Sequence, residues 1–352
     1  MSSDIHSIHP YPCKFPPDIV TKDLHPGQVF LDPFCGSGTS LLEAKRRGLE
    51  VIGIDCNPIA TLISRVKLSA PLAPDDEALD LLEANLAVER FEKTHELLPD
   101  FAGRDHWFSE GAQWGVRAVQ RQLALLIDRH VAWDVAAVAL SAITNRVSNQ
   151  DSETRYARVE RQWLPGEVIE VYLKKLHSIR LALQERGELS GGIADIRTSD
   201  FVDDSDLPDS CVDVIFTSPP YANTMDYYLY HKQRMNVLGF DFKFVQGQEI
   251  GSRHEFSSKK APRDKWHSDY RASLQSMQRV LRDGGRAYVV IGDSQIAGEL
   301  IAADTMTIEI ARALDFSVEV LASEGMAGKS RTFNSRFQRP NKREHVIMLR
   351  KK

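Results

Sequence analysis

The chain has 352 residues, 42% of them hydrophobic and 26% charged, with a formal net charge of −5. These proportions are close to those of soluble globular proteins, and the length allows one large domain or two to three ordinary ones. No apolar stretch of the sequence approaches the roughly 18 to 20 residues that a membrane-spanning helix requires, which excludes a chain that crosses a membrane. The first residues also lack the apolar centre of a secretory signal. We therefore expect a soluble, cytoplasmic protein that does not bind a membrane.

The cysteines argue against both a disulfide framework and a zinc ribbon. Cys13, Cys35, Cys56 and Cys211 are widely spaced and form no Cys-x-x-Cys pair. Such a distribution is typical of a reducing compartment, and it predicts no metal site.

Charge is distributed unevenly along the chain. Residues 71–110 contain eleven acidic side chains and three basic ones, whereas residues 326–352 contain nine basic and one acidic. A basic segment can contact nucleic-acid phosphates even in a protein that is acidic as a whole. A solvated tail is the alternative interpretation of the same segment.

From residue 28 onward, strand-like and helix-like segments alternate. A predicted strand over 28–34 leads into the turn GSG, which is followed by a predicted helix over 39–48 and a second strand over 49–57. This order within about thirty residues predicts a parallel α/β sheet. Similar units return later, where we expect strands over 211–216, 284–293, 317–323 and 344–351 and helices over 221–239 and 299–316.

The region between these two α/β segments has a different pattern. Residues 75–186 carry long helical periodicities and almost no strand signal. We interpret residues 71–189 as a mostly helical insertion and a candidate target-recognition region. Residues 1–70 and 190–352 would then form one discontinuous α/β domain, a Rossmann-like sheet with helices on both faces.

The first chemical motif, LDPFCGSGT, ends the first predicted strand. Asp32 stands at the carboxyl end of that strand, where open α/β sheets bind ligands, and Gly36 and Gly38 allow the backbone to approach a ligand closely. Asp55, 23 residues later, ends the second strand and can accept both ribose hydroxyls of an adenosine-type cofactor. The turn lacks the full Gly-x-Gly-x-x-Gly pattern and the P-loop lysine, so a dinucleotide or ATP site is less well supported. A plain helix-entry turn is the structural alternative.

The second motif, TSPPY at 217–221, follows the strand over 211–216. Consecutive prolines stiffen the backbone, so the Ser218 hydroxyl and a neighbouring carbonyl such as that of Pro219 can be aimed at one point. This pair suits an exocyclic amine, which has two hydrogens to donate, and the ring of Tyr221 offers a face for a planar base. A base would have to leave its helix to reach such a pocket. A tight turn without chemistry is the simpler interpretation.

Together these motifs resemble those of the S-adenosylmethionine-dependent DNA amino-methyltransferases, which methylate exocyclic nitrogens. LDPFCGSGT resembles the cofactor motif of this family, TSPPY its catalytic motif, and HPYPCKFPP at 9–17 the segment over the methionine part of the cofactor. The three motifs occur in the family's order, and the resemblance covers roughly residues 5–66 and 190–352. It implies a methyltransferase sheet, S-adenosyl-L-methionine as cofactor and DNA as partner. It says little about the helical insertion.

The resemblance also implies which residues form the site. The implied cofactor contacts are His9, Lys14, Asp32, Pro33, Phe34, Gly36, Gly38, Thr39, Asp55, Asn57 and Asp200. Among them, Asp55 would bind the ribose and Asp200 would lie near the adenine ring. The residues that would hold the target base are Ser218, Pro219, Pro220 and Tyr221.

The Ser-Pro-Pro-Tyr form of the second motif indicates which base is methylated. In this family Ser-Pro-Pro-Tyr occurs more often with cytosine N4 and Asp-Pro-Pro-Tyr with adenine N6, so we expect site-specific methylation of cytosine N4 in a flipped base. Adenine N6 is the first alternative, followed by RNA or protein methylation and then by a non-catalytic DNA-binding subunit. A cognate restriction endonuclease is the functional partner that such an enzyme would have in a restriction–modification system.

Three polar or basic segments are candidates for DNA contact. One lies in the insertion, at 144–163, one is the long polar segment at 240–266, which we interpret as a mobile loop, and one lies at 329–343 between the last two strands. Arginine and lysine side chains there can contact phosphates and base edges. The predicted contacts are Arg146, Arg155, Arg158, Lys259, Lys260, Arg331 and Arg336. Ordinary ion pairs on a solvated surface are the alternative.

Overall fold

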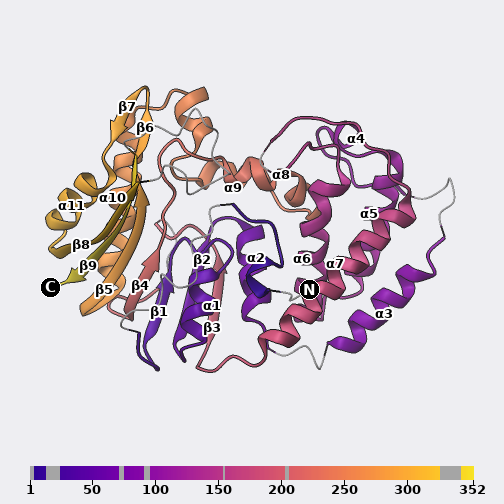
Figure 1. Ribbon diagram of the computed structural model, residues 1–352, viewed down its shortest axis with the longest axis horizontal. Coiled ribbons are helices and arrows are strands. Elements are labelled where there is room, and N and C mark those ends of the chain that lie inside the picture. The colour runs from indigo at the N-terminus through magenta and orange to yellow at the C-terminus, as the bar shows by residue number, and fades with distance from the viewer. Residues whose placement is uncertain are drawn as a thin grey trace. The chain divides into compact units, whose positions relative to one another are not determined.

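The computed structural model describes residues 4–12, 24–70, 75–90, 96–153, 155–202, 206–325 and 342–352. The chain divides into two compact units (Figure 1). A helical unit comprises Met1–Tyr11, Arg65–Leu189 and Leu229–Lys243, and an α/β unit comprises Pro12–Ser64, Ser190–Tyr228 and Phe244–Lys352. The helical unit thus takes in residues 1–11 and 229–243, which the sequence pattern assigns to the α/β domain.

A seven-stranded sheet forms the centre of the α/β unit, in the order β3-β2-β1-β4-β5-β9-β8. Its strands are β1 (Val29–Asp32), β2 (Glu50–Asp55), β3 (Ala194–Thr198), β4 (Val212–Thr217), β5 (Leu281–Gly292), β8 (Phe316–Gly325) and β9 (Arg343–Lys351). Strands β1 to β5 are parallel, and β9 is antiparallel to both β5 and β8. The strands β6 (Ser294–Ile296) and β7 (Glu299–Ile301) form a separate antiparallel hairpin. The predicted Rossmann-like sheet is therefore confirmed.

The strand order reverses between β1 and β4. From β1 the chain proceeds outward to β2 and β3, and it later adds β4 and β5 on the other side of β1. Open α/β sheets bind their ligands outside the carboxyl ends of the strands at such a switch point. Strand β1 ends at Asp32 and β4 ends at Thr217, so both sequence motifs begin at this edge.

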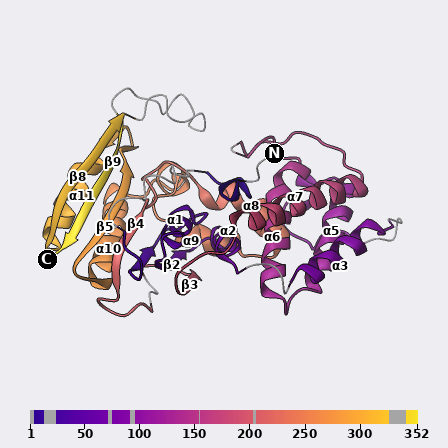
Figure 2. The same cartoon turned by 60° about the horizontal axis from the view of Figure 1, so that its bottom comes forward.

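Helices cover the sheet and supply much of its core. Three helices of this unit are α1 (Thr39–Lys45), α10 (Arg263–Val280) and α11 (Ala303–Ala313); α2 (Pro58–Leu68) begins in the unit, and most of α9 (Phe242–Gln248) belongs to it. Helix α1 packs on β1 and β2, α10 packs on β5, and α11 packs along β8 and β9, as Figure 2 shows. Trp266 and Tyr270 of α10 are buried and stacked, with ring centroids 5.1 Å apart.

Residues 240–266 contain helices where the sequence predicts a mobile loop. They form α9 (Phe242–Gln248), the π-helical turn η3 (His254–Ser258) and the first residues of α10. Val245, Phe256 and Trp266 are buried and anchor this segment. The loop prediction is wrong because these apolar anchors are about ten residues apart, which produces no helical or strand periodicity in the sequence.

The helical unit is built around α6 (His130–Val147). Thirteen of the 18 residues of α6 are buried, as expected for a helix surrounded by others. Around it lie η1 (Ile5–Ser7), α3 (Asp76–Ala87), α4 (Arg104–Trp107), α5 (Glu110–Ala124), α7 (Pro165–Arg186) and most of α8 (Tyr227–Leu238). The pairs α5–α7 and α6–α7 make its main helix contacts. In the part of the chain that the structure describes, no helix combines the length and the apolarity needed to cross a membrane.

The helical unit buries an entire arginine side chain. Arg234 of α8 is 0% exposed, and its guanidinium donates to the carbonyl oxygens of Ser141 at 3.1 Å and Tyr230 at 3.0 Å and to the carboxylate of Glu153. A buried charge is tolerated only where it is paired and hydrogen-bonded. These bonds explain why residues 229–243 belong to the helical unit.

Gly115 in α5 should tolerate no side chain, because α5 and α7 meet there. An added Cβ would lie 2.6 Å from Val168 Cβ and 2.8 Å from the Pro165 carbonyl oxygen. Gly115→Ala is therefore expected to lower the free energy of unfolding by about 1–3 kcal/mol. Gly166→Ala is the matched control, since nothing lies within 4 Å of its added Cβ, and it should be neutral or stabilising by up to about 1 kcal/mol. Denaturant titration measures both, and equal destabilisation would contradict the close approach.

Candidate active site

The carboxylate of Asp32 joins the two sequence motifs. Strands β1 and β4 are neighbours, and Asp32 at the end of one accepts a hydrogen bond from Thr217 Oγ1 at the end of the other, at 2.7 Å. The same carboxylate accepts from Ser40 Oγ and from the Phe34 backbone N–H at 3.2 Å. Asp32 is 1% exposed, so its oxygens are used within the protein. Its burial raises its pKa to about 6, although these three hydrogen bonds oppose the rise.

The glycine turn depends on backbone shapes that favour glycine. Gly36 and Gly38 have φ angles of +51° and +72°, in the left-handed region. An added Cβ on Gly38 would lie 2.6 Å from Ser64 Oγ of α2, so the turn also packs closely against that helix. The Gly36 N–H is directed at Asp55 Oδ2, at 2.9 Å. The turn is therefore fixed against the end of β2 as well as the end of β1.

Asp55 and Asn57 present unused hydrogen-bonding capacity at the end of β2. Asp55 accepts from Gly36 N and from Asn57 N, each at 2.9 Å, and an ionised carboxylate can accept further bonds. Its burial raises its pKa to about 6. Asn57 Oδ1 accepts from Ile59 N, whereas its Nδ2 is buried and has no partner in the described part of the chain. A ligand with hydroxyl donors and a polar acceptor would satisfy both groups.

The other predicted cofactor residues of the α/β unit also lie near these turns. Phe34 is half-buried beside Phe201, with ring centroids 6.4 Å apart, and Asp200 follows β3 with a carboxylate that accepts from Val202 N at 2.8 Å. Pro33 and Thr39 are buried in the turn and at the start of α1. The predicted cofactor residues of the α/β unit that the structure describes thus lie at or just after the carboxyl ends of β1, β2 and β3.

His9 belongs to the helical unit, where both of its ring nitrogens are engaged. Nδ1 lies 2.6 Å from the Pro10 carbonyl oxygen and Nε2 lies 2.9 Å from Ser141 Oγ. Since a carbonyl only accepts, Nδ1 carries the proton and Nε2 accepts from the hydroxyl. Burial, together with the charge of Arg234, holds the pKa of His9 well below its usual value. Its contact with a cofactor stays a prediction, and Lys14 lies outside the described residues.

The TSPPY turn is fixed by residues distant in the sequence. Tyr221 OH donates to Glu344 Oε1 of β9 at 2.9 Å, and Ser218 Oγ lies 3.4 Å from the same phenol oxygen, to which it donates. The indole N–H of Trp266 points to the Pro220 carbonyl oxygen at 3.4 Å. Ser218 and Tyr221 remain half-buried, so their polar atoms can meet a ligand. Sequence reasoning missed Glu344 and Trp266, because nothing near either residue marks it as a partner of this turn.

Glu249 is a further buried carboxyl group that sequence reasoning missed. Its Oε1 accepts from the backbone N–H groups of Tyr227 and Tyr228 at the start of α8. Its Oε2 is buried and has no partner in the described part of the chain. Burial raises the pKa of Glu249 to about 8, and the charges of Asp226 and Asp55 contribute to the rise. Glu249 is therefore largely protonated at neutral pH.

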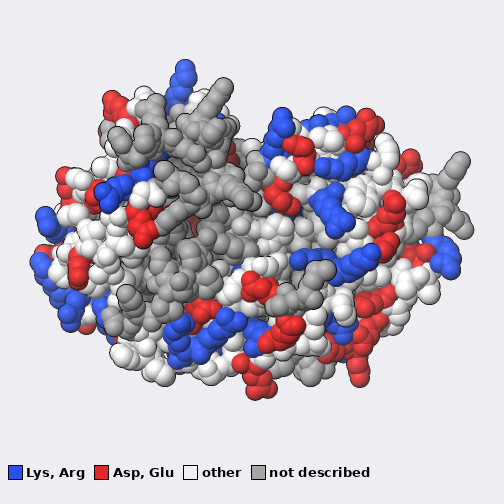
Figure 3. All heavy atoms as spheres, viewed as in Figure 1, with Lys and Arg blue, Asp and Glu red and all other residues white. Residues whose placement is uncertain are grey.

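The predicted DNA contacts lie on the surfaces of both units. All five that the structure describes are exposed: Arg146, Arg155, Arg158, Lys259 and Lys260. The three arginines belong to the helical unit, where Arg155 pairs with Asp151 at 3.2 Å. The two lysines directly follow η3 in the α/β unit. Arg331 and Arg336 lie outside the described residues. Figure 3 shows basic and acidic side chains interspersed over the described surface of the face that it draws.

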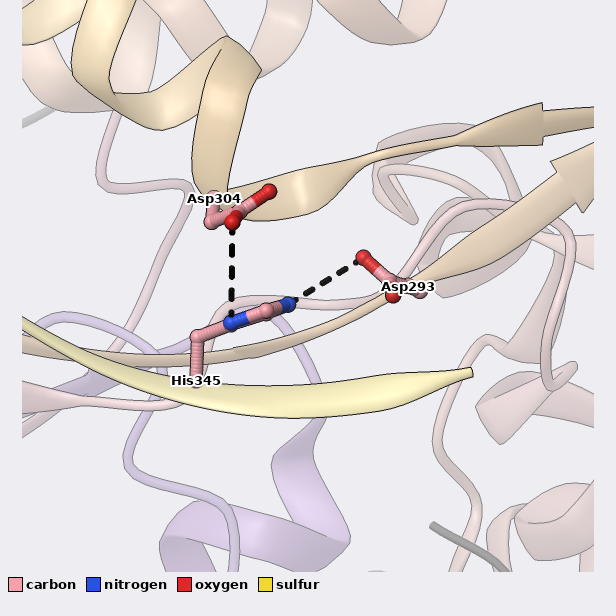
Figure 4. A group of neighbouring side chains, drawn as sticks. All are labelled: Asp293, Asp304 and His345. Atoms are coloured by element: carbon pink, nitrogen blue, oxygen red, sulfur yellow. Dashed lines mark hydrogen bonds and ion pairs between the residues drawn. The ribbon is translucent and has the colours of Figure 1, made fainter. Parts of the chain in front are cut away.

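A buried imidazole lies between two carboxylates near the end of β5 (Figure 4). His345 Nε2 is 3.2 Å from Asp293 Oδ1, and its Nδ1 is 2.8 Å from Ser323 Oγ and 4.0 Å from Asp304 Oδ2. Asp293 also accepts the first backbone N–H groups of α11 and β9, at 2.9 and 3.0 Å. The two carboxylates approach different ring nitrogens in Figure 4, and one ligand atom from each of the three side chains lies within 4.8 Å of the others, so the group could hold a metal ion. The cluster ties β9 and α11 to the end of β5.

Removing the Thr217 hydroxyl should destabilise the protein in a pH-dependent way. Thr217→Val leaves the buried Asp32 with one donor fewer, and the free energy of unfolding should fall by about 1–3 kcal/mol. The lost bond favours the ionised form of Asp32, whose pKa is about 6. The cost should therefore be larger at about pH 8 than at about pH 5. Thr307→Val is the control, since the Thr307 hydroxyl bonds to two neutral groups, the Ala303 carbonyl and the Tyr270 hydroxyl. Equal costs for Thr217→Val at the two pH values in denaturant titrations would contradict this role.

Glu249 should make the protein less stable as the pH rises. Its pKa in the folded protein, about 8, is above the ordinary value of 4.5, so the folded state binds this proton more tightly. The resulting stabilisation is complete below the unfolded pKa and is lost as the pH rises through the folded pKa. Glu249→Gln keeps an acceptor for α8 and cannot ionise, so its stability relative to the unaltered protein should increase between about pH 5 and about pH 9. The increase has an upper bound of about 1.4 kcal/mol per unit of pKa shift.

Denaturant titration at several pH values measures this difference. Glu319→Gln, which removes an exposed carboxylate of β8, should follow the unaltered protein across the same range. Parallel pH profiles for Glu249→Gln and the unaltered protein would show that Glu249 is not protonated in the folded state.

Comparison with known proteins agrees with this geometry. A family model described as DNA methylase matches residues 3–64 and 212–352, more than half of the chain. The Type II methyltransferase M.MvaI of Kocuria varians is 27% identical over 272 residues, which make up 70% of this chain and 59% of that protein. The Type II methyltransferase M.BsoBI of Geobacillus stearothermophilus is 24% identical over 282 residues, or 70% and 54% of the two chains. The Type II methyltransferase M.MjaII of Methanocaldococcus jannaschii is 43% identical over 68 residues, 18% of this chain and 13% of that protein. The chain thus spans less than two thirds of the length of each of these relatives.

The family match covers both turns that meet at Asp32. Residues 3–64 include the glycine turn and Asp55, and residues 212–352 include TSPPY, Trp266 and Glu344. Methyltransferases of this family depend on S-adenosyl-L-methionine. The chain belongs to the DNA methylase family of N6/N4 amino-methyltransferases.

Proposed function

We propose that this chain transfers a methyl group from S-adenosyl-L-methionine to the exocyclic amine of a DNA base turned out of its helix, with cytosine N4 as the expected acceptor. The observation that carries the proposal is the bond from Thr217 to Asp32, at 2.7 Å, which holds the cofactor-type turn beside the TSPPY turn. A reaction between two bound groups is accelerated when both are held at a fixed separation and orientation. Adenine N6 is the alternative acceptor.

The residues at the ends of β1 and β2 fit this cofactor. Asp55 retains acceptor capacity for ribose hydroxyls, and the orphaned Asn57 Nδ2 offers a buried donor. Gly36 and Gly38 keep the turn free of side chains that would block an approaching ligand. When bound, the cofactor supplies an electrophilic methyl group on a sulfonium centre. The role of the chain is to bind and orient it.

The TSPPY turn supplies the acceptors for an amine. The Ser218 hydroxyl donates toward Tyr221 OH, which donates to Glu344, so the Ser218 oxygen is left free to accept an amine hydrogen. With a carbonyl of the turn accepting the second hydrogen, the nitrogen lone pair would leave conjugation with the ring and become available to the methyl carbon that the bound cofactor would supply. The nitrogen would form its bond to that carbon as the carbon–sulfur bond breaks, and it would then release one proton to solvent. No covalent enzyme intermediate is needed.

The expected base and partners follow from resemblance and from surface charge. A neutral serine, in place of aspartate, begins the Pro-Pro-Tyr turn, which favours cytosine N4 within this family. We assign phosphate contacts to Arg146, Arg155, Arg158, Lys259 and Lys260, which are exposed. The curated relatives are named Type II methyltransferases, and we extend to this chain a role in a restriction–modification pair with a cognate endonuclease.

Mass spectrometry of nucleosides tests the reaction. Methyl-free DNA of mixed sequence, incubated with the protein and S-adenosyl-L-methionine, should yield N4-methylcytosine. Ser218→Ala and Pro220→Ala should each lower kcat by on the order of 10²-fold, because the first loses an acceptor for the amine and the second loosens the turn. Ser317→Ala is the matched control and should keep full activity, since the exposed Ser317 pairs with Arg350 at the opposite end of the sheet.

The outcomes separate the alternatives. N6-methyladenine would retain the reaction and overturn the base. No methylated base in DNA of many sequences would overturn the proposed function, and the same assay on RNA would then follow.

A further inference from the structure

The chain directly after TSPPY adopts a backbone shape that it would not keep by itself. Asn223 has a φ angle of +51°, in the left-handed region that few residues with side chains adopt. Asparagine is among the residues that enter this region most readily, and there its side chain can bond to nearby backbone. The turn therefore depends on what surrounds Asn223.

Three hydrogen bonds hold Asn223 from two directions. Its backbone N–H donates to the Gly251 carbonyl oxygen at 2.8 Å, and its Nδ2 donates to the Gln295 carbonyl oxygen of β6 at 2.8 Å. Ser257 Oγ of η3 donates to Asn223 Oδ1 at 2.9 Å. The amide side chain thus uses both its carbonyl and its amino group and connects the β6–β7 hairpin with η3.

Residues 249–266 also contact the rest of the chain that follows TSPPY. Asp226 Oδ1 accepts from His254 N at 2.7 Å, next to the α8 residues that Glu249 caps. At the other end of the turn, Trp266 reaches the Pro220 carbonyl oxygen at 3.4 Å. Residues 249–266 therefore contact the turn from Pro220 to the start of α8. Asn223 bridges to the hairpin as well.

We propose that Asn223 is a positioning residue for the target-base turn, held in place by Ser257. This inference rests on the proposed function. Asn223 follows Tyr221 by two residues, so its left-handed backbone sets the direction in which the chain leaves the base-binding motif. Loosening it moves the hydroxyl and carbonyl acceptors relative to the methyl donor. A displacement of about 1 Å at a reacting centre lowers the rate by on the order of 10²-fold.

Two substitutions separate the effect of the left-handed backbone from the effect of the side-chain hydrogen bonds. Asn223→Gly removes both side-chain bonds and adopts the left-handed shape without strain, whereas Asn223→Ala removes the bonds and strains the backbone as well. Both should lower kcat by about 10-fold or more at saturating DNA and cofactor, while KM for each stays unchanged. Ser257→Ala, which removes one bond, should have a smaller effect of the same kind. Ser317→Ala is the matched serine control and should change neither constant.

Hydrogen exchange gives a readout that does not need turnover. The peptide over residues 217–228 should exchange faster in Asn223→Gly and Ser257→Ala than in the unaltered protein, with peptides of β1 and β2 unchanged. Unchanged exchange in that peptide would overturn the positioning role, whether or not the protein methylates DNA. If the unaltered protein is active and Asn223→Gly keeps the full kcat, the positioning role is overturned as well. An unaltered protein that methylates no DNA would instead overturn the proposed function.

Discussion

A single buried carboxylate, that of Asp32, holds the two turns of this site together. It accepts hydrogen bonds from the end of the neighbouring strand β4, from the turn after its own strand and from the start of α1, and it is almost completely removed from solvent. Hydrogen bonds to a charged group are worth about 1.5–3 kcal/mol each, but burial opposes the charge. The carboxylate is therefore stable only when β1, β4 and α1 are all in place, so the glycine turn and the TSPPY turn form together.

A second set of contacts then restrains the TSPPY turn from outside. Glu344, which pairs with Gly292 at the end of the β5–β9 ladder, binds the Tyr221 hydroxyl. Trp266 and Asn223 connect the chain at the turn to α10, η3 and the β6–β7 hairpin. These elements are helices and strands of the α/β unit. Placing reactive groups on a loop that is bonded to such elements gives the loop the precision that positional catalysis requires.

The carboxyl edge of the sheet is also unusual electrostatically. Burial raises the pKa of Asp32 and Asp55 to about 6 and that of Glu249 to about 8, and the charge of Asp55 contributes to the rise at Asp32 and at Glu249. Perturbed groups of this kind cluster at functional sites. Excess negative charge near a partly buried edge is costly in the free protein, and a cationic ligand offsets that cost. The sulfonium of the family's cofactor is such a ligand.

The sequence by itself determined the strand and turn motifs, since prolines, glycines and apolar runs act on the backbone within a few residues of their own position. It predicted the sheet and the two turns at Asp32 and Ser218 correctly. It did not show that Thr217 would bind Asp32, nor that Glu344 would meet Tyr221, because these pairs are separated by 185 and 123 residues. The apolar anchors of residues 240–266 were likewise too sparse to form a pattern. Only the tertiary structure decided these contacts, because strand order, not local sequence, sets which distant side chains share an edge.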